Sequence, residues 1–349
     1  MSTRIALPQL LPQALLAWYN KNARALPWRK DRDPYRVWVS EIMLQQTGAE
    51  VVARYYPRFL EAFPTVQALA GADEHALMKR WEGLGYYARA RNMQKAARVI
   101  AEKYAGVFPD TYEALRELPG VGDYTAGAVA SICFDRPTPA VDGNVIRVVA
   151  RIAGIGDEIT DAVKKSIAEA LRAIYPTDRP GDFTQSLMEL GAVVCLPNGQ
   201  PRCALCPAAG LCAALRDGTA LSLPVKKRKP EKKREERTVF LLSCGGSLAL
   251  RHRENSGLLG GLWELPNVSG ALDEAGAVRQ AEAWGTRPAA LIKALRRSHI
   301  FTHIRWDMVC YEIACREKTP DFTWVTAREL RESYALPTAF SKFLDGEKE

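Results

Sequence analysis

Histidine is scarce in this sequence, and long apolar runs are absent. The chain has 349 residues but only four histidines, and His75 alone precedes residue 250. We therefore expect no histidine-based catalytic centre in the first two thirds of the chain. Carboxylates remain the candidates for acid–base chemistry in that part.

Membrane and secretion signals are missing as well. No apolar run approaches the length that crosses a bilayer, and the N-terminus lacks a signal-type cleavage site. We expect a soluble protein of a bacterial-type cytoplasm. Eight cysteines are present, but a disulfide framework is not expected in that compartment. Cys133, Cys244, Cys310 and Cys315 lie in apolar stretches, which is typical of buried thiols.

The positive charge is modest and mostly local. The formal net charge is +8, which weakly favours a polyanionic partner. Residues 226–237 hold eight Lys or Arg and three Glu, so this segment contributes +5 and leaves +3 for the rest. A solvated linker explains such a run better than a dedicated binding patch. Charge alone therefore does not establish nucleic-acid binding.

The spacing of apolar residues differs between the first 222 residues and the rest of the chain. Residues 1–222 carry apolar residues at helical spacing between short Gly and Pro turns, which predicts a mainly α domain. Residues 223–237, with two prolines, are expected to form a basic linker. Beyond it, strand patterns at 238–253 and 306–315 and helical patterns at 273–285 and 326–333 predict an α+β domain over 238–349.

The segment LPGVGDYTAG (118–127) predicts a hairpin between two helices. Gly120 and Gly122 flank Val121, and glycine permits backbone geometry that other residues resist. The amides of such a turn, together with a helix N-terminus, bind an anion such as a DNA phosphate. An ordinary tight connection is the alternative, but the flanking Leu-Pro and Thr-Ala-Gly favour the phosphate-binding hairpin.

Two carboxylates are candidates for catalysis. Glu41 shares a predicted helix face with Trp38, Ile42 and Gln45, so desolvation should raise its pKa and suit it to donate a proton. Asp142 precedes a predicted helix, where backbone amides would hold it ionised and suited to stabilise a cation. The plain alternatives are an Arg-paired surface Glu and a structural N-cap. Cleavage of a nucleoside needs both an acid and a cation stabiliser.

Four cysteines lie close together near the end of the helical part. Their spacing, C-x7-C-x2-C-x5-C, is a strong metal-binding signal. The chemistry of four thiols leaves a zinc site and an iron–sulfur cluster open. The four residues are Cys195, Cys203, Cys206 and Cys212.

These features, in this order, resemble the adenine DNA glycosylases of the MutY family, which belong to the helix-hairpin-helix DNA glycosylase superfamily. The resemblance rests on the hairpin, the cysteines and the segments 26–29 (LPWR), 40–47, 83–92, 141–145 and 188–192. It implies a two-lobed helical catalytic domain that carries a 4Fe–4S cluster rather than zinc. The first cysteine gap has seven residues where the family usually has six.

The resemblance also assigns roles to residues. Glu41 matches the acid that protonates adenine, and Asp142, with Asn144 beside it, matches the residue that stabilises the sugar cation. The adenine pocket would be lined by Trp28, Arg29, Gln185 and Glu189, and Gln46 and Tyr86 would wedge into the duplex. Tyr124 occupies the place of the Schiff-base lysine in the endonuclease III type, and a phenol cannot form an imine. A monofunctional glycosylase is therefore expected.

The C-terminal third resembles the same family and, in fold, Nudix hydrolases. The carboxylate-rich Nudix catalytic helix is absent from 268–286, so this domain is expected to recognise rather than to hydrolyse. The resemblance implies that Phe301, Thr302 and His303 sense 8-oxoguanine opposite the adenine. Thr302 stands where the family usually has Ser.

The resemblance, with the features that carry it, implies a monomeric base-excision-repair enzyme that removes adenine mispaired with 8-oxoguanine or guanine in duplex DNA. Three alternatives remain. Tyr124 argues against a bifunctional pyrimidine glycosylase-lyase, and the presence of both carboxylates argues against a non-catalytic DNA-binding protein with structural zinc. The missing carboxylate helix argues against a Nudix nucleotide hydrolase.

Overall fold

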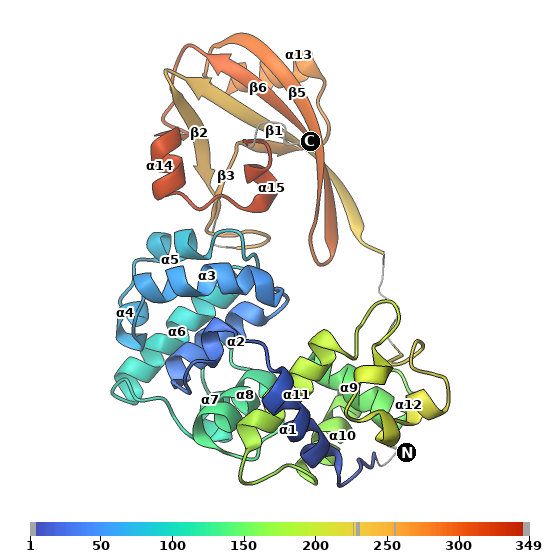
Figure 1. Ribbon diagram of the computed structural model, residues 1–349. Coiled ribbons are helices and arrows are strands. Elements are labelled where there is room, and N and C mark those ends of the chain that lie inside the picture. The colour runs from blue at the N-terminus through green and yellow to red at the C-terminus, as the bar shows by residue number, and fades with distance from the viewer. Residues whose placement is uncertain (1–4, 226, 228–230, 255, 345–349) are drawn as a thin grey trace. The chain divides into compact units, whose positions relative to one another are not determined.

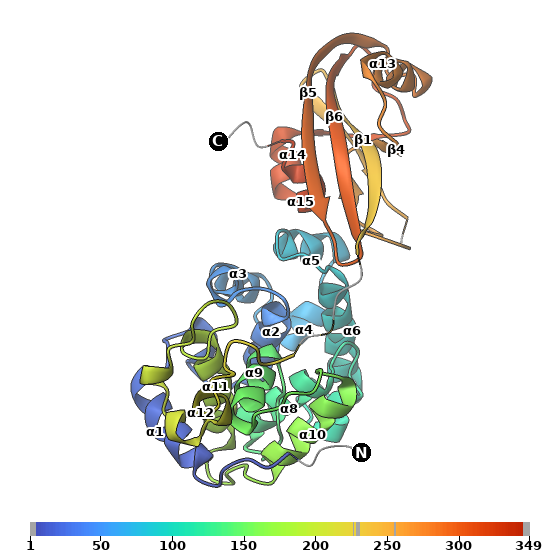
Figure 2. The ribbon, with the colours of Figure 1, turned by 90° about the vertical axis from the view of Figure 1, so that its right-hand side faces the viewer.

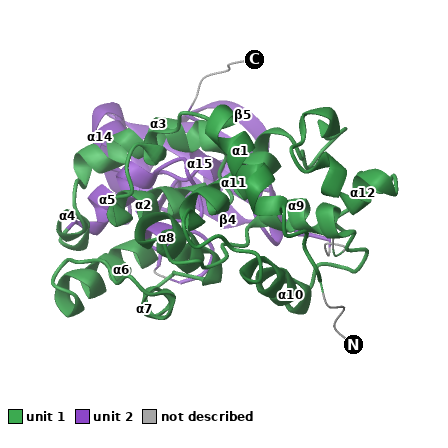
Figure 3. Cartoon of the chain, turned by 60° about the horizontal axis from the view of Figure 1, so that its bottom comes forward, with its two compact units in different colours: residues 1–71, 91–228 green, residues 72–90, 229–349 purple. Residues whose placement is uncertain are grey.

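A computed structural model describes residues 5–225, 227, 231–254 and 256–344. The chain forms two compact units, which Figure 3 shows in different colours. Unit 1 comprises residues 1–71 and 91–228, and unit 2 comprises residues 72–90 and 229–349. In the described part of the chain, no helix has both the length and the apolar character needed to span a membrane.

Unit 1 is helical, which confirms the predicted mainly α part. Its elements are α1 (Leu11–Asn22), η1 (Pro27–Arg29), α2 (Pro34–Leu44), α3 (Ala49–Ala62), α4 (Val66–Ala70), α6 (Ala88–Lys103), α7 (Tyr112–Arg116), α8 (Asp123–Phe134), α9 (Gly143–Ala153), α10 (Asp161–Arg172), α11 (Pro180–Val193), η2 (Cys203–Leu205), η3 (Ala209–Leu211) and α12 (Ala213–Arg216) (Figure 1). The first three residues of α6 belong to unit 2.

Small residues bring the central helices α8, α9 and α11 close together. A Cβ atom on Gly127 of α8 would lie 2.3 Å from the carbonyl oxygen of Pro139, just before α9. A Cβ on Gly191 of α11 would lie 2.5 Å from the Cβ of Asn144 in α9. Atoms cannot approach so closely in a packed interior, so only glycine fits at these contacts. Helix α8 is thereby held against the segment that leads into α9, and α11 is held against the start of α9.

Unit 2 contains a mixed sheet with helices packed against it (Figure 2). The strands are β1 (Lys233–Cys244), β2 (Ser247–His252), β3 (Trp263–Glu264), β4 (Asn267–Ser269), β5 (Pro288–Ile300), β6 (Ile304–Cys315) and β7 (Thr323–Thr326), and the helices are α5 (Glu74–Trp81), α13 (Glu274–Ala283), α14 (Ala327–Glu332) and α15 (Thr338–Ser341). The main strand order is β3-β2-β1-β6-β5, with β1 and β6 parallel and the other pairs antiparallel. This arrangement confirms the predicted α+β class.

Alternation along β1 gives the sheet two apolar faces. Val239 and Leu241 pack in one core with residues of α14 and α15, whereas Phe240 and Leu242 pack in another with Ala277 and Ala281 of α13. Successive side chains of a strand point to opposite faces, so a continuous apolar run covers both sides. The same logic explains why an unbroken apolar run in the sequence forms a strand buried between two helical layers.

Two parts of the structure differ from the sequence predictions. β1 begins at Lys233, so the end of the predicted linker 223–237 is paired with β6 from Lys233↔Ile304 to Arg237↔Met308. Lys233, Arg234 and Glu236 remain exposed on this paired backbone, and Glu235 and Arg237 are partly exposed, so the charge run does not exclude a strand. Residues 226 and 228–230 of that linker lie outside the described part.

The long strand β5 had no counterpart in the sequence pattern. Its partly buried residues include Leu291, Leu295 and His299, a four-residue spacing that does not alternate as in an ordinary strand. Pairing with β6, with irregularities near Pro288 and Leu291, imposes the extended conformation instead. Tertiary pairing therefore overrides the local pattern here.

Candidate active site

A cavity of about 740 Å³ lies within unit 1. Its walls come from η1, the end of α2, the hairpin before α8, the start of α9 and one face of α11. Eleven of the residues predicted for the site line it: Trp28, Arg29, Glu41, Gln46, Gly120, Gly122, Tyr124, Asp142, Asn144, Gln185 and Glu189. The structure thus brings together segments that are far apart in the sequence.

Glu41 is a buried carboxyl group at the cavity wall. Helix α2 starts at Pro34, capped by Asp33, and is buried almost all round, so that Glu41 is only 4% exposed. The phenol of Tyr124 donates a hydrogen bond to its carboxylate. Burial raises the pKa of Glu41 to about 7, with a further rise from the charge of Asp142, against the opposing effects of Tyr124 and Arg29. A carboxyl group with this pKa can deliver a proton at neutral pH.

Asp142 caps α9 and faces the same cavity. Its Oδ1 accepts the backbone amide of Val145 at 2.7 Å, and its Oδ2 accepts the Asn144 amide at 2.8 Å. Burial raises the pKa of Asp142, while these hydrogen bonds and Arg147 act in the opposite direction. The hydrogen bonds fix the carboxylate in place beside Glu41. The predicted N-cap is therefore present, and its side chain also lines the cavity.

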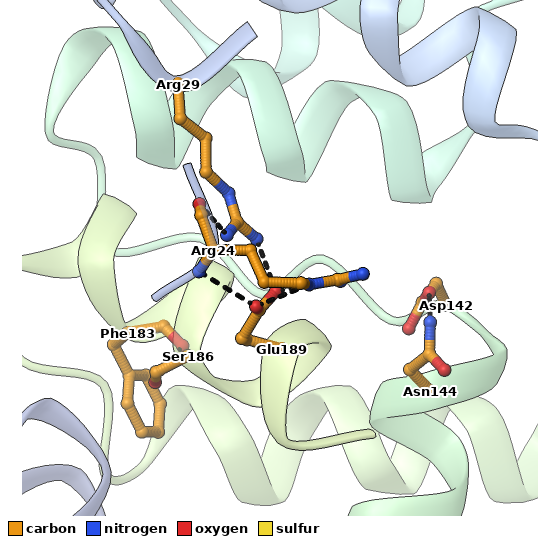
Figure 4. Close-up of polar contacts among 7 residues, drawn as sticks. All are labelled: Arg24, Arg29, Asp142, Asn144, Phe183, Ser186 and Glu189. Carbon is orange, nitrogen blue, oxygen red and sulfur yellow. Dashed lines mark hydrogen bonds and ion pairs between the residues drawn. The ribbon is translucent and has the colours of Figure 1, made fainter. Parts of the chain in front are cut away.

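Glu189 is the centre of a buried ion-pair cluster. Figure 4 shows two guanidinium groups directed at its carboxylate: Arg24 Nε lies 2.7 Å from Oε1, and an Arg29 nitrogen lies 2.8 Å from Oε2. The Arg24 backbone amide donates to Oε1 as well, at 3.1 Å. Burial acts to raise the pKa of Glu189, but the hydrogen bonds from the two arginines outweigh it and lower the pKa. The cavity therefore contains a proton donor and a fixed anion at different walls.

Arg24 was missed by the sequence analysis. It lies 165 residues from Glu189 in the chain, and no local pattern links the two. The only available signal was its position shortly before the LPWR segment.

The two predicted wedge residues share an uncommon backbone conformation. Gln46 has a φ of 58° and Tyr86 a φ of 48°, both in the left-handed region that non-glycine residues rarely occupy. Residues held there against their preference cluster at functional sites. Gln46 is exposed at the cavity of unit 1, whereas Tyr86 belongs to unit 2 and its side chain is 49% exposed.

The hairpin between α7 and α8 has the expected glycine geometry at one position. Gly120 has a φ of 75°, and a Cβ there would lie 2.6 Å from Asn92. Gly122 is the residue before α8 and has an ordinary φ of −89°. Val121 is buried, and its amide donates to the Leu118 carbonyl at 3.1 Å. The hairpin therefore presents the exposed Gly120 and Gly122 next to the start of a helix.

The four predicted metal-ligand cysteines line one apolar cavity beside α9 and α11. Buried Arg151 donates to Cys195 Sγ at 3.2 Å, and buried Arg147 donates to the Cys195 carbonyl at 2.7 Å. Four thiols with two neighbouring arginines suit a negatively charged thiolate-bound centre. In the described residues, no group of three or more His, Cys, Asp or Glu is arranged to hold a metal ion.

In unit 2, Phe301, Thr302 and His303 form the turn between β5 and β6, as a loop between strands. The Phe301 ring packs edge-on against Trp306, with centroids 4.9 Å apart. Lys232 Nζ donates to the Phe301 carbonyl at 2.7 Å. Helix α13 carries two acidic residues, Glu274 and Glu282.

Comparison with protein families matches both parts of the chain. Residues 39–173 match the model of the HhH-GPD superfamily base excision DNA repair protein, and residues 238–346 match the NUDIX domain model. The first range contains Glu41, the hairpin and Asp142, and the second contains the sheet of unit 2.

Individual relatives cover most of the chain. An adenine DNA glycosylase of Rattus norvegicus is 37% identical, with 94% of this chain and 76% of the relative aligned. The adenine DNA glycosylase of Homo sapiens is 36% identical over 94% of this chain and 72% of its own. Among solved structures, a thermostable thymine-DNA glycosylase matches with a TM-score of 0.54 and 28% identity, over 60% of this chain and 96% of its own.

Proposed function

Because the chain belongs to the adenine DNA glycosylase family, we propose that it removes adenine from duplex DNA as a base-excision-repair enzyme. The mispairs proposed as substrates are adenine opposite 8-oxoguanine and adenine opposite guanine. One observation carries the proposal: the buried Glu41, with a pKa of about 7, and the fixed Asp142 share one cavity. An acid and an anion so placed are what glycosidic cleavage requires.

The cavity accounts for base selection. The glycosidic bond is unreachable in stacked DNA, so adenine must leave the helix and enter a pocket. Trp28 offers an apolar wall, and Gln185 and Glu189 offer polar contacts. Glu189 is held ionised by Arg24 and Arg29, whose four hydrogen bonds occupy both of its oxygens. We propose that the exocyclic amine of adenine replaces one of these donors when the base enters the pocket.

Bond cleavage then uses the two carboxyl groups in turn. Glu41 donates its proton to a ring nitrogen of adenine, and the bonding electron pair leaves with the base. The sugar becomes an oxocarbenium-like cation, which the Asp142 carboxylate stabilises with Asn144 beside it. The ionised Glu41 then accepts a proton from the water that adds to the sugar. Tyr124 offers a phenol and no amine, so the strand stays intact.

Three groups of residues are proposed to contact the DNA. The hairpin at Gly120, Val121 and Gly122 is proposed to bind a backbone phosphate. Gln46 and Tyr86 are proposed to fill the space that the extruded adenine leaves. In unit 2, Phe301, Thr302 and His303 are proposed to contact 8-oxoguanine.

The cysteines Cys195, Cys203, Cys206 and Cys212 are proposed to hold a 4Fe–4S cluster. When bound, such a cluster would supply a covalent cross-link that fastens the segment from 195 to 212 beside α9. We propose that catalysis resides within 1–222 and lesion recognition within 238–349, in a monomer acting on chromosomal DNA in the cytoplasm.

The proposal is tested with a panel of single-mismatch duplexes. The full chain should release free adenine from the A:8-oxoguanine and A:G duplexes, and the strand should break only after heat or alkali. Release of a pyrimidine, or strand breakage without that treatment, would assign the protein to a different activity.

A further inference from the structure

Residues 72–90 connect the proposed wedge residue Tyr86 with the C-terminal part of the chain, which holds the proposed lesion-recognition turn. They form one compact unit with residues 229–349 and carry Tyr86, a proposed wedge residue (Figure 3). They lie within the segment matched by the base excision repair model. This part of the chain therefore contacts the C-terminal residues directly, as side chains of α5 show.

Lys79 and Glu82 bind the backbone of the C-terminal segment. Lys79 Nζ lies 3.0 Å from each of the carbonyl oxygens of Leu330 and Tyr334 and 2.6 Å from Glu82 Oε2. Glu82 Oε1 in turn accepts the backbone amide of Leu336 at 2.7 Å. All three ammonium protons thus have acceptors, and both carboxylate oxygens have donors. We refer to Lys79 and Glu82 as the clamp.

The clamp is more than a surface ion pair. The side chains of Lys79 and Glu82 are 17% and 29% exposed, so solvent screens them less than an open pair. Leu330 lies in the last turn of α14, whose carbonyls have no partner within the helix, and a lysine there satisfies one of them. The clamp therefore determines where residues 330–336 lie against α5.

The clamp stands immediately before the loop that holds Tyr86. Three of the four residues after Glu82 have left-handed conformations: Gly83 at φ 92°, Gly85 at 69° and Tyr86 at 48°. The loop is tied to α5, because the indole of fully buried Trp81 donates to the Gly85 carbonyl at 3.0 Å. A non-glycine residue in this conformation persists only when its surroundings hold it.

The other end of the connection reaches the proposed lesion loop. Phe301 packs on Trp306 with centroids 4.9 Å apart, and Trp306 on Phe340 at 6.1 Å. Leu330 and Leu336 belong to the same apolar core. A continuous series of packed residues therefore joins the turn at 301–303 to the backbone that the clamp binds.

We propose that Lys79 and Glu82 are positioning residues that couple recognition of the opposite base to the Tyr86 loop. The inference rests on the proposed roles of Tyr86 and of the 301–303 turn. Contacts to 8-oxoguanine would favour one arrangement of the core and, through the clamp, one position of Tyr86. Guanine makes no such differential contact, so the clamp should matter less for that mispair.

The test uses the full chain and a double-mutant cycle. Lys79→Met keeps the aliphatic stem and removes the three hydrogen bonds, and Tyr86→Ala removes the wedge. Single-turnover excision is measured opposite 8-oxoguanine and opposite guanine. Lys79→Met should slow excision opposite 8-oxoguanine about tenfold and excision opposite guanine no more than about twofold, which is the size of effect that coupling energies between sites imply. In the Tyr86→Ala background, Lys79→Met should add less than about a twofold loss.

A matched control is available in unit 1. Lys164 and Asp161 form an exposed pair with the same three-residue spacing, at 2.8 Å. Lys164→Met should leave both rates unchanged. Glu82→Gln keeps an oxygen for the Leu336 amide but loses the charge, so its effect should have the same direction as that of Lys79→Met and a smaller size. If Lys79→Met does not fold, Glu82→Gln decides the question.

Hydrogen exchange separates the clamp from the proposed function. Amides at 83–87 should exchange faster in Lys79→Met than in the wild type, whatever the protein excises. Unchanged exchange at these amides would refute the positioning role of the clamp. Equal losses of rate on the two duplexes, or additive losses in the double-mutant cycle of Lys79 and Tyr86, would refute it as well. Absence of adenine excision by the wild type would instead refute the proposed function.

Discussion

A buried carboxyl group that must stay protonated should weaken the fold at high pH. The pKa of Glu41 is about 7 in the folded chain, against an ordinary value of 4.5 for a glutamate in the unfolded chain. Well below pH 4.5 Glu41 is protonated in both the folded and the unfolded chain, so its ionisation does not change the free energy of unfolding. As pH rises toward 7, the unfolded chain ionises first and stability is lost. The difference between the pKa of Glu41 in the folded chain and in the unfolded chain lowers the free energy of unfolding by about 3 kcal/mol at pH 8 and by about 1 kcal/mol at pH 5.

Glu41→Gln should therefore stabilise the protein in a pH-dependent manner. The amide has nearly the shape of the acid and still accepts the Tyr124 hydrogen bond. The assay is urea unfolding of wild type and variant at pH 5 and pH 8. The variant should gain about 2 kcal/mol more at pH 8 than at pH 5.

Glu189→Gln provides the matched control, because Glu189 is also a fully buried glutamate. Its pKa is lowered, so its charge stabilises the fold, and this stability is present above the unfolded pKa and lost in acid. Glu189→Gln should accordingly destabilise the protein at pH 8. A Glu41→Gln variant no more stable than wild type at pH 8 would refute the assigned pKa and its cause.

Three further outcomes are expected. The single-turnover excision rate should fall as pH rises through about 7, because the acid form of Glu41 is required. Tyr124→Phe should move the midpoint of this pH profile upward by about one pH unit, since the Tyr124 hydrogen bond lowers the Glu41 pKa. An unmoved midpoint would contradict this role of Tyr124. At one fixed salt concentration, the double variant Phe301→Ala and Thr302→Ala should slow excision opposite 8-oxoguanine by about tenfold and excision opposite guanine far less, because a specific contact contributes about 1–3 kcal/mol. Equal losses on the two duplexes would mean that the turn adds only general affinity for DNA. Purified protein should be brown and contain about four iron atoms per chain, whereas stoichiometric zinc without iron after anaerobic purification would support a structural zinc site.

Local sequence patterns predicted the parts of the site that are themselves local. Asp142 before a helix and the glycines at 120 and 122 have a signature within a few residues, and the structure places them at one cavity. Helical spacing also placed Glu41 on a helix, although α2 is buried on nearly all sides rather than on one face.

Features that depend on distant partners were not predictable in the same way. The pairing of Arg24 with Glu189 and the clamp of Lys79 on residues 330–336 join segments more than a hundred residues apart. The strand β5 forms through pairing with β6 despite a spacing unlike a strand. A single sequence carries no sign of such contacts, because they arise only after folding.

The central claim is that Glu41 is the acid that releases adenine. Its most direct test is single-turnover excision by wild type and Glu41→Gln on the A:8-oxoguanine duplex, with duplex binding measured in parallel. Wild type should release adenine, and the variant should bind the duplex with similar affinity but excise about a thousandfold more slowly. Near-normal excision by Glu41→Gln would contradict the account, since the cavity would then cleave the bond without its proposed proton donor.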